Sequence, residues 1–190
     1  MLGTTVTLPA APKRIAANLV TAAALWDLGI EAVAVFDYTA TAYPDGDHIA
    51  WGNIDVSKVV NVGDVDGNIL PEDLLTVKPD VILTLTFDPG DPSQTAGVIP
   101  DMAEAIGQIA PVLVVTDMAS TEIQLQRLVD LGASLGADLN APAIVEAQER
   151  YEAKVREFQA VAADKADLAV IFANADSPDA GEFWETLSLE

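Results

Sequence analysis

Residues that could take part in chemistry stand directly after apolar runs of the sequence. Asn18, Asp37 and Asp88 each follow such a run. Carboxylate and amide groups can hold a metal ion or accept hydrogen bonds, and carboxylates can also transfer protons. Aromatic residues occur near them, and aromatic rings often form the walls of a ligand site. The candidate ligand-binding residues are Asn18, Tyr38, Tyr43, His48, Trp51, Asp64, Phe87 and Asp88.

One segment matches the pattern of a serine nucleophile. The sequence GASLG at residues 132–136 has the G-x-S-x-G spacing of a nucleophile elbow. It falls at the end of a predicted amphipathic helix, whereas the elbow requires a strand-to-helix turn. The single histidine, His48, also precedes the serine, against the usual chain order. We therefore predict no catalytic residue. A one-domain enzyme that acts through carboxylates such as Asp88 and Asp117 is the rival hypothesis.

Another segment resembles half of a calcium-binding loop. The sequence DVDGN at residues 64–68 departs from the D-x-D-x-D-G register, and Leu75 takes the place of the closing glutamate. The chain has no cysteine and one histidine, so a zinc or manganese site would need mostly carboxylate ligands. The sequence predicts no resident metal site.

A long polar stretch from residue 39 to about residue 58 contains three of the candidate residues. Loops of this length inside a domain are usually functional or disordered, and the aromatic residues argue against disorder. His48 can be a surface residue or a ligand contact. Tyr43 and Trp51 can pack within the loop or stack on a ligand. The sequence leaves these alternatives open.

The composition limits the classes of partner. The chain has 190 residues, of which 51% are hydrophobic, and a net charge of −21 from 30 acidic and 9 basic residues. Nucleic acids and anionic membranes are recognised by clustered lysine and arginine, which this chain lacks. We therefore expect neither partner, and no apolar run is long enough to cross a bilayer. The start at Met1 has no signal-peptide pattern, so the protein is either cytoplasmic or a trimmed form of an exported one.

Four apolar runs are typical of buried strands, and helical segments separate them. Because the strands are apolar on both faces, helices should cover both sides of a parallel sheet. Residues 1–140 are therefore predicted to form one α/β domain. The predicted strands are residues 15–17, 32–36, 81–87 and 112–116.

Local signals predict where the first helices begin and end. Asn18 or Thr21 can cap a helix over residues 22–28. A second helix begins near Pro71, which suits a first helical position. It ends at Lys78, because a residue that precedes proline is biased away from helical geometry.

Two further helices are predicted in the second half of the domain. Pro100 opens one helix, and Gly107 closes it. Thr121, with Gln124 three residues later, forms a capping box that begins the next helix.

A different helix is predicted over residues 141–163. Its length of about 33 Å, at 1.5 Å per residue, is enough to cross a whole domain. Another apolar run at residues 168–173 predicts a strand, and residues 164–190 are too few to form a core of their own. The apolar stripe of the long helix consists of Ile144, Ala147, Tyr151, Val155, Phe158 and Ala162.

Several of these segments together resemble a known family. They are VTLPAAPKRIAAN, AAALWDLGI and NVGDVDGNILPEDLLTVKPDVILTL, followed by IAPVLVV and a long helix. This arrangement resembles the amino-terminal lobe of class III periplasmic binding proteins, the receptors of ABC importers for ferric siderophores, haem and cobalamin. The resemblance covers residues 4 to about 175. Its most specific part runs from Gly63 through Glu72 to Lys78-Pro79-Asp80.

The resemblance implies two α/β lobes joined by one long helix, with the ligand held between the lobes. Residues 1–140 then correspond to the amino-terminal lobe, 141–163 to the connecting helix and 164–190 to the start of a second lobe. It implies no catalysis and no cofactor, because iron enters only as part of a bound chelate. The expected ligand is a ferric siderophore, with cobalamin or haem as the alternative.

The resemblance also implies partners and a location. Glu72 matches the position at which family members present a glutamate to a basic pocket of the permease. The protein is expected to be extracytoplasmic, either free or held by a lipid anchor, with its signal sequence absent from this chain. Because a second lobe would cover apolar surface, we also expect the chain to self-associate through residues 141–190.

The basic residues bear on the charge of the ligand. Receptors of this family for catecholate siderophores carry several basic residues in the cleft, since those complexes are multiple anions. None of the basic residues of the predicted lobe falls at the carboxyl end of a strand in the sequence. They are Lys13, Arg14, Lys58, Lys78 and Arg127.

Overall fold

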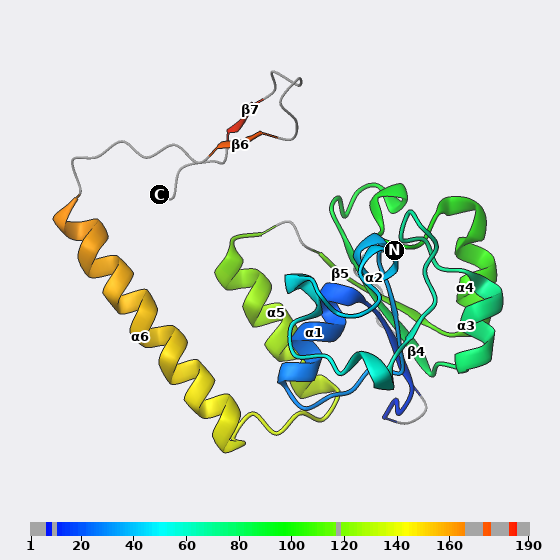
Figure 1. Cartoon of the computed structure of the whole chain (residues 1–190), viewed down its shortest axis with the longest axis horizontal. Helices are drawn as coiled ribbons and strands as arrows, with labels where there is room; N and C mark the ends of the chain where they lie inside the picture. Colours follow the sequence, from blue (N-terminus) through cyan, green and yellow to red (C-terminus); the bar gives the residue numbers. More distant parts are fainter. Residues whose placement is uncertain (1–6, 9–10, 117–118, 166–172, 176–182, 186–190) are drawn as a thin grey trace. The chain divides into compact units, whose positions relative to one another are not determined.

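The computed structural model describes residues 7–8, 11–116, 119–165, 173–175 and 183–185. The chain divides into two compact units, Met1–Ile144 and Val145–Glu190. Figure 1 shows the path of the chain through both units. The first unit contains the sheet, and each unit is described by itself below.

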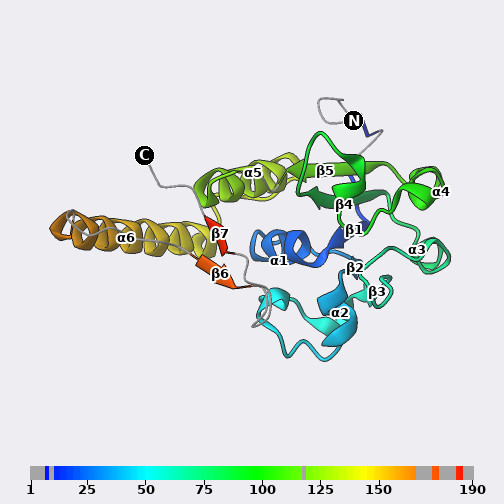
Figure 2. The same ribbon diagram turned by 90° about the horizontal axis from the view of Figure 1, so that it is seen from above.

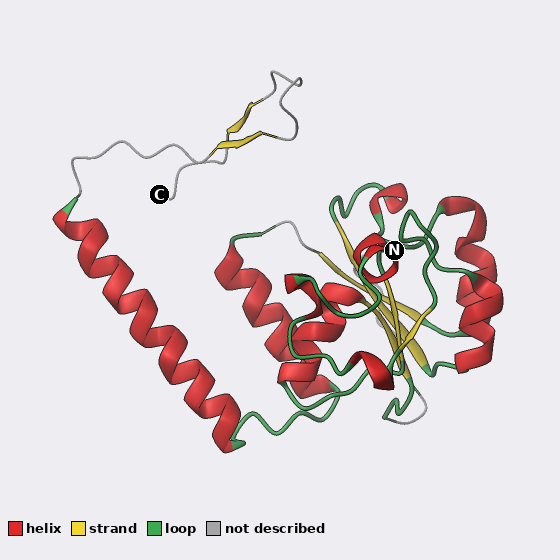
Figure 3. Ribbon diagram, viewed as in Figure 1, coloured by secondary structure: helices red, strands yellow, loops and turns green. Residues whose placement is uncertain are grey.

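The first unit is built on a five-stranded parallel sheet (Figure 3). The strand order is β3-β2-β1-β4-β5, so the chain moves outward from β1 to β3 and then returns to place β4 on the other side of β1. The predicted α/β class with a parallel sheet is confirmed. The strands are β1 (Ile15–Asn18), β2 (Ala34–Phe36), β3 (Val60–Asn61), β4 (Val81–Thr86) and β5 (Val112–Thr116).

Alternate residues of β1, β2, β4 and β5 enter two separate hydrophobic clusters. Ile15 and Ala17 of β1 belong to the cluster that contains α1 (Leu19–Asp27) and receives residues of α5 (Thr121–Ser134). Ala16 belongs to the cluster on the opposite face. That second cluster contains residues of α3 (Pro71–Val77) and α4 (Ala103–Ile109). Helices therefore cover both faces of the sheet (Figure 1), which explains why its strands are apolar on both sides.

The first helices begin and end close to the predicted residues. Helix α1 starts three residues before the predicted run, and Asn18 caps it by accepting a hydrogen bond from the backbone N–H of Val20 at 3.1 Å. Helix α3 ends at Val77, before Lys78 adopts a left-handed conformation with φ 45°. The helix end predicted from Lys78-Pro79 is therefore confirmed.

Two predicted helix signals are wrong. Gly107 does not close its helix, because α4 continues through it to Ile109 after a short 3-10 helix at Pro100–Met102. Thr121 does not cap α5, because Ser120 occupies the N-cap position and makes no side-chain capping bond. The Gln124 side chain instead donates to the carbonyl oxygen of Ala119 at 3.0 Å.

The long polar stretch after β2 has local structure along its length. It contains the helix α2 (Tyr38–Ala42) and two 3-10 helices, Ile49–Trp51 and Val56–Lys58. It leads directly into β3, a strand that the sequence analysis did not predict. The stretch is therefore an ordered part of the first unit.

The described residues of the second unit include most of one long helix and two short strands. Helix α6 (Pro142–Asp164) matches the predicted helix over 141–163 to within one residue at each end. Strands β6 (Ala173–Ala175) and β7 (Phe183–Glu185) pair in an antiparallel fashion (Figure 2). The predicted strand at 168–173 lies outside the described residues except for Ala173. Among the described helices, none is long and apolar enough to cross a membrane.

Candidate ligand-binding edge of the sheet

A hydrogen-bonded pair joins the carboxyl ends of two neighbouring strands. The Asn18 amide at the end of β1 donates to Oδ2 of Asp37 over 3.1 Å, just after β2. The other carboxylate oxygen of Asp37 accepts from the backbone N–H of Thr39 at 2.8 Å and so caps α2. Because Asn18 is only 3% exposed, it fixes the edge of the sheet and offers little surface to a ligand.

Two aromatic side chains at this edge are open to solvent. Tyr38 begins α2 and is 61% exposed, and Phe87 follows β4 and is 51% exposed. Both rings follow strands of one parallel sheet, at the edge where ligands of such sheets bind. Ile49, in the long segment between α2 and β3, and Val65, in the loop after β3, are also exposed, and neither was among the predicted residues.

Asp64 is held by the loop that it belongs to. Its Oδ1 accepts from the backbone N–H groups of Asp66 at 2.9 Å and Asn68 at 2.8 Å. Partial burial pushes the pKa of Asp64 upward, but the hydrogen bonds from Asn68, Asp66 and Gly67 outweigh it and hold the pKa below its usual value. The Thr41 hydroxyl donates to the Asp64 carbonyl at 2.9 Å, which ties this loop to α2.

Tyr43, His48 and Trp51 form one packed group. The rings of Tyr43 and His48 stack with centroids 4.8 Å apart, and Nδ1 of His48 accepts from the backbone N–H of Ala50 at 3.2 Å. The Trp51 indole N–H donates to the Tyr43 carbonyl at 2.8 Å. Trp51 is 3% exposed and belongs to the core, so its ring packs within the protein and does not form a ligand wall. Tyr43 stays 42% exposed above it.

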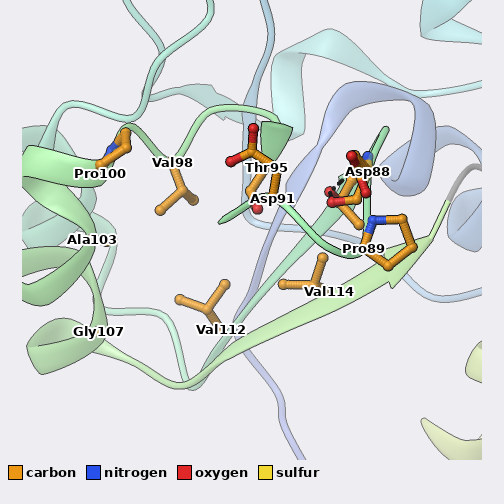
Figure 4. Close-up of a pocket in the computed structure, with 11 residues that line it drawn as sticks. Asp88, Pro89, Asp91, Thr95, Val98, Pro100, Ala103, Gly107, Val112 and Val114 are labelled. Carbon is orange, nitrogen blue, oxygen red and sulfur yellow. Dashed lines mark hydrogen bonds between the residues drawn. The ribbon is translucent and has the colours of Figure 1, made fainter. Parts of the chain in front are cut away.

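Asp88 lies in a tight turn after β4. Its Oδ1 accepts from the backbone N–H of Gly90 at 2.7 Å, and the Thr86 hydroxyl donates to its carbonyl at 3.0 Å. Beside this turn is a cavity of about 320 Å³, with walls from β4, β5, α4 and the segment between β4 and α4 (Figure 4). Asp88 was expected from the sequence but the cavity was not, because its walls come from β4, β5, α4 and the segment between β4 and α4, which meet only in the fold.

Most basic residues of the first unit lie at the amino ends of the strands, away from the candidate binding edge. Arg14 precedes β1 and donates through Nη2 to the Val77 carbonyl at 2.6 Å, and Lys78 comes before β4. Arg127 is different, because its Nη1 donates to the Thr116 carbonyl at the carboxyl end of β5 over 2.9 Å. No local pattern predicts this contact, since the guanidinium reaches the strand end from α5. The expectation that no basic residue of the lobe reaches a strand's carboxyl end needs this correction.

The remaining sequence motifs lie in ordinary secondary structure. Ser134 lies at the last position of α5 and donates to the Leu131 carbonyl at 2.7 Å, so the G-x-S-x-G segment is not a strand-to-helix elbow. Within the described residues, no three His, Cys, Asp or Glu side chains are grouped so that they could hold a metal ion. Glu72 is exposed in the first turn of α3, where the helix dipole favours a negative charge.

The structure thus brings some predicted residues together and separates others. Asn18 joins Asp37 at the edge of the sheet, and the Tyr43, His48 and Trp51 group forms within the long loop. Among the described residues, no side-chain hydrogen bond or ring contact joins Asp64 or Asp88 directly to either group, although the Asp64 loop is bonded to α2 through Thr41. The candidate site is therefore an edge lined by separate loops, with Tyr38 and Phe87 as its most exposed rings.

Comparison with known proteins identifies solved structures of the same fold. No protein-family model and no curated protein sequence matches the chain. The structure of DesE, a ferric-siderophore receptor protein from Streptomyces coelicolor, is similar with a TM-score of 0.80 and 32% sequence identity. The match covers 93% of this chain and 58% of the DesE chain, so the chain spans less than two thirds of that receptor.

Two less similar structures share the fold. FhuD from Vibrio cholerae, solved with bound Fe3+-Desferal, has a TM-score of 0.56 at 21% identity, over 87% of this chain and 58% of its own. The siderophore periplasmic binding protein from the fuscachelin gene cluster of Thermobifida fusca has a TM-score of 0.53 at 24% identity, over 87% and 55% of the two chains. The match to DesE confirms the resemblance to siderophore receptors, and the other two matches support the fold. The matched proteins are binding proteins rather than enzymes.

Proposed function

We propose that the chain is part of an extracytoplasmic solute-binding component of an ABC importer, and that this component binds a ferric siderophore or a similar bulky iron chelate. The similarity to DesE carries the proposal, because it combines 32% identity with a TM-score of 0.80 over 93% of the chain. The more distant receptors support only the fold.

The geometry of the sheet edge supports a binding role. In parallel sheets the ligand crevice lies outside the carboxyl ends of the strands, and β1 and β4 are neighbours at the point where the strand order reverses. Tyr38 and Phe87 expose their rings at this edge. Asn18 and Asp37 hold the start of α2 in place, so Tyr38 is presented from a fixed backbone. Rings on a rigid edge suit the apolar parts of a chelate.

The distribution of charge favours a chelate with little negative charge. Lys78 and Arg14 lie at the amino end of the strands, and Arg127 is engaged with the Thr116 carbonyl. Asp88 adds a carboxylate at the binding edge. A multiply anionic complex would meet repulsion from this carboxylate, and Arg127 is the cation placed to offset it within the described residues.

Fluorescence quenching by a panel of ligands tests the proposal. The panel consists of ferric hydroxamates, ferric catecholates, haem and cobalamin, titrated into the full-length gene product. Trp51 is the useful reporter, since its indole is bonded to the carbonyl of Tyr43, whose ring is exposed. Replacing Trp26 and Trp184 by phenylalanine leaves Trp51 as the single tryptophan of this chain.

The expected result is saturable quenching by one class of ferric chelate, with hydroxamates stronger than catecholates. Saturable quenching by haem or cobalamin alone would replace the siderophore by the alternative ligand. Chemical turnover of a ligand without stable binding would overturn the proposal and favour the carboxylate enzyme.

Export, anchoring and the permease contact belong to the same proposal. Glu72 is exposed at the start of α3, where its carboxylate can reach a basic pocket of a permease. The protein is held outside the cytoplasm, with a lipid anchor as one means of attachment. Mass spectrometry of the mature protein isolated from its own cells tests both the processing and the lipid.

Self-association of the 190-residue chain is proposed from the surface of α6. Tyr151, Phe158 and Val161 are 48%, 65% and 58% exposed along this helix. Exposed apolar stripes of this kind promote association. Light scattering coupled to size-exclusion chromatography should give a mass above 19.9 kDa at high concentration. A monodisperse monomer would contradict this part of the proposal.

A further inference from the structure

The cavity beside the Asp88 turn has an apolar interior. Val112 and Val114 of β5 point toward Val98, which lies on the segment between β4 and α4 (Figure 4). Ala103 and Gly107 of α4 complete the wall with small groups that leave the space open. The volume of about 320 Å³ is at the lower end of the range for small-molecule sites. The cavity therefore suits a short aliphatic chain rather than a whole chelate.

Two carboxylates line the same cavity. Asp88 and Asp91 belong to the turn that forms its rim. Each is oriented by its own turn, since Oδ1 of Asp88 accepts from Gly90 N–H at 2.7 Å and Oδ1 of Asp91 accepts from Ser93 N–H at 2.9 Å. The Ser93 hydroxyl also donates to Asp91 at 2.7 Å, and this bond lowers the pKa of Asp91, so its carboxylate is charged at neutral pH.

No basic side chain lines the cavity to balance these charges among the described residues. Neither carboxylate makes an ion pair in the described part of the chain. The negative rim and the apolar interior together are complementary to a positive group that is carried on an aliphatic chain. A negatively charged ligand would gain nothing from the rim, and a purely polar ligand would gain nothing from the apolar interior.

We propose that this cavity binds an alkylammonium group, with the alkyl chain against Val98, Val112 and Val114 and the ammonium beside Asp88 and Asp91. The identity of the molecule that carries this group rests on the proposed function. If the chain binds a ferric chelate at the edge next to Asp88, the alkylammonium is an amine-terminated arm of that chelate. The cavity then selects among chelates by their arm.

Methyl NMR of the isotopically labelled 190-residue chain tests the inference without any iron complex. The probe is hexylammonium, and the matched controls are hexanol, which lacks the charge, and hexanoate, which reverses it. Hexylammonium should shift the methyl signals of Val98, Val112 and Val114 and should bind more tightly than either control. Butylammonium should bind more weakly, by about fourfold for each methylene lost from the buried chain.

Isosteric variants identify the source of the preference. Asp88→Asn and Asp91→Asn keep an oxygen that can accept the Gly90 or Ser93 hydrogen bond. Each should weaken hexylammonium binding by about two- to fivefold and leave hexanol binding unchanged, the range expected for a partly exposed charge pair. Asp73→Asn, at an exposed position on α3, is the matched control and should change neither ligand.

The outcomes separate this inference from the proposed function. Equal binding of hexylammonium and hexanol, or shifts at methyl groups elsewhere in place of the three valines, overturns the inference and leaves chelate binding to be judged by quenching alone. Loss of chelate quenching with intact hexylammonium binding contradicts the proposed function and not the cavity. If both hold, chelates with an amine-terminated arm should bind more tightly than N-acetylated forms of the same chelates.

Discussion

The amide of Asn18 donates to the carboxylate of Asp37 over 3.1 Å, and each of the two side chains also caps the helix that follows its strand. This single bond links the ends of β1 and β2 with the starts of α1 and α2. The edge of the sheet that presents Tyr38 is therefore held by polar groups that are themselves buried or half-buried.

Asn18→Ala should destabilise the protein by roughly 1–3 kcal/mol, because it removes the cap of α1 and leaves Asp37 without its partner. Urea unfolding monitored by circular dichroism measures the change. Asn53→Ala is the matched control, since Asn53 donates to Asp27 at 2.8 Å on the exposed surface. That substitution should lower the free energy of unfolding by no more than about 0.5 kcal/mol. Equal losses for the two variants would contradict the structural role of Asn18.

Gly67 is in contact with the backbone that carries Tyr38. Its φ is 84°, and a Cβ there would lie 2.5 Å from the Tyr38 nitrogen. Gly29 has a similar φ of 80° with no neighbour within 4 Å of the Cβ position. Gly29→Ala should therefore lower the free energy of unfolding only by the roughly 1–2 kcal/mol that a left-handed backbone conformation costs an L-residue. Gly67→Ala should cost about 1–3 kcal/mol more, because the backbone must also move.

Thermal unfolding of the two variants checks the difference, and ligand quenching checks its consequence. Gly67→Ala should weaken chelate binding through a shifted Tyr38, whereas Gly29→Ala should leave it unchanged. Identical stability of the two variants would mean that the approach of Gly67 to Tyr38 is not tight.

Asp80 links the pH dependence of stability to the start of β1. Its carboxylate accepts from the backbone N–H groups of Lys13 at 2.8 Å and Arg14 at 3.0 Å, and these bonds lower the pKa of Asp80 in the folded protein. A lowered folded pKa stabilises the fold above the unfolded value of about 3.9. The contribution is lost as the pH falls from there through the folded pKa.

Asp80→Asn should therefore be less stable than the wild type at pH 7 and should lose less stability between about pH 5 and pH 2.5. Urea unfolding at a series of pH values measures both effects. Asp101→Asn removes an exposed carboxylate that makes no hydrogen bond in the described part of the chain. The stability of this variant should change with pH in parallel with that of the wild type. Parallel curves for Asp80→Asn and the wild type would contradict the prediction.

Glu72 should act in transport and not in binding. In the full-length protein, Glu72→Gln should reduce chelate uptake by cells severalfold and leave the affinity for the chelate unchanged, because an exposed carboxylate that docks to arginine acts only in the complex. Glu104→Gln, at the equivalent first turn of α4, is the control and should not affect uptake. A parallel fall in affinity and uptake for Glu72→Gln would place Glu72 in the ligand site instead.

Much of the fold could be predicted from the sequence, because the signals were local. The strands at β1, β4 and β5 are apolar on both faces, and the left-handed Lys78 before Pro79 ends its helix as the sequence indicated. Strand β3 was missed because it is only two residues long, Val60–Asn61, and is not fully buried. Its place in the sheet comes from pairing with β2, which no local pattern encodes.

The site was harder to predict, because it depends on contacts between distant residues. Arg127 reaches the end of β5 from a helix, so its place along the chain does not predict the contact. Trp51 is a residue type that often lines ligand sites, but here its ring is buried in the core and its indole N–H is bonded to the Tyr43 carbonyl. The cavity beside Asp88 forms where β5 and α4 face the Asp88 turn, and these three segments meet only in the folded chain.

The central claim is that the protein binds an iron chelate reversibly and without chemistry. Equilibrium dialysis of the full-length protein against a ferric hydroxamate that carries radioactive iron tests it most directly. The predicted result is saturable retention of one intact chelate per protein, with competition by the unlabelled ferric complex and weaker competition by the iron-free siderophore. Retention of iron without its chelate, or no retention of either, would contradict the claim.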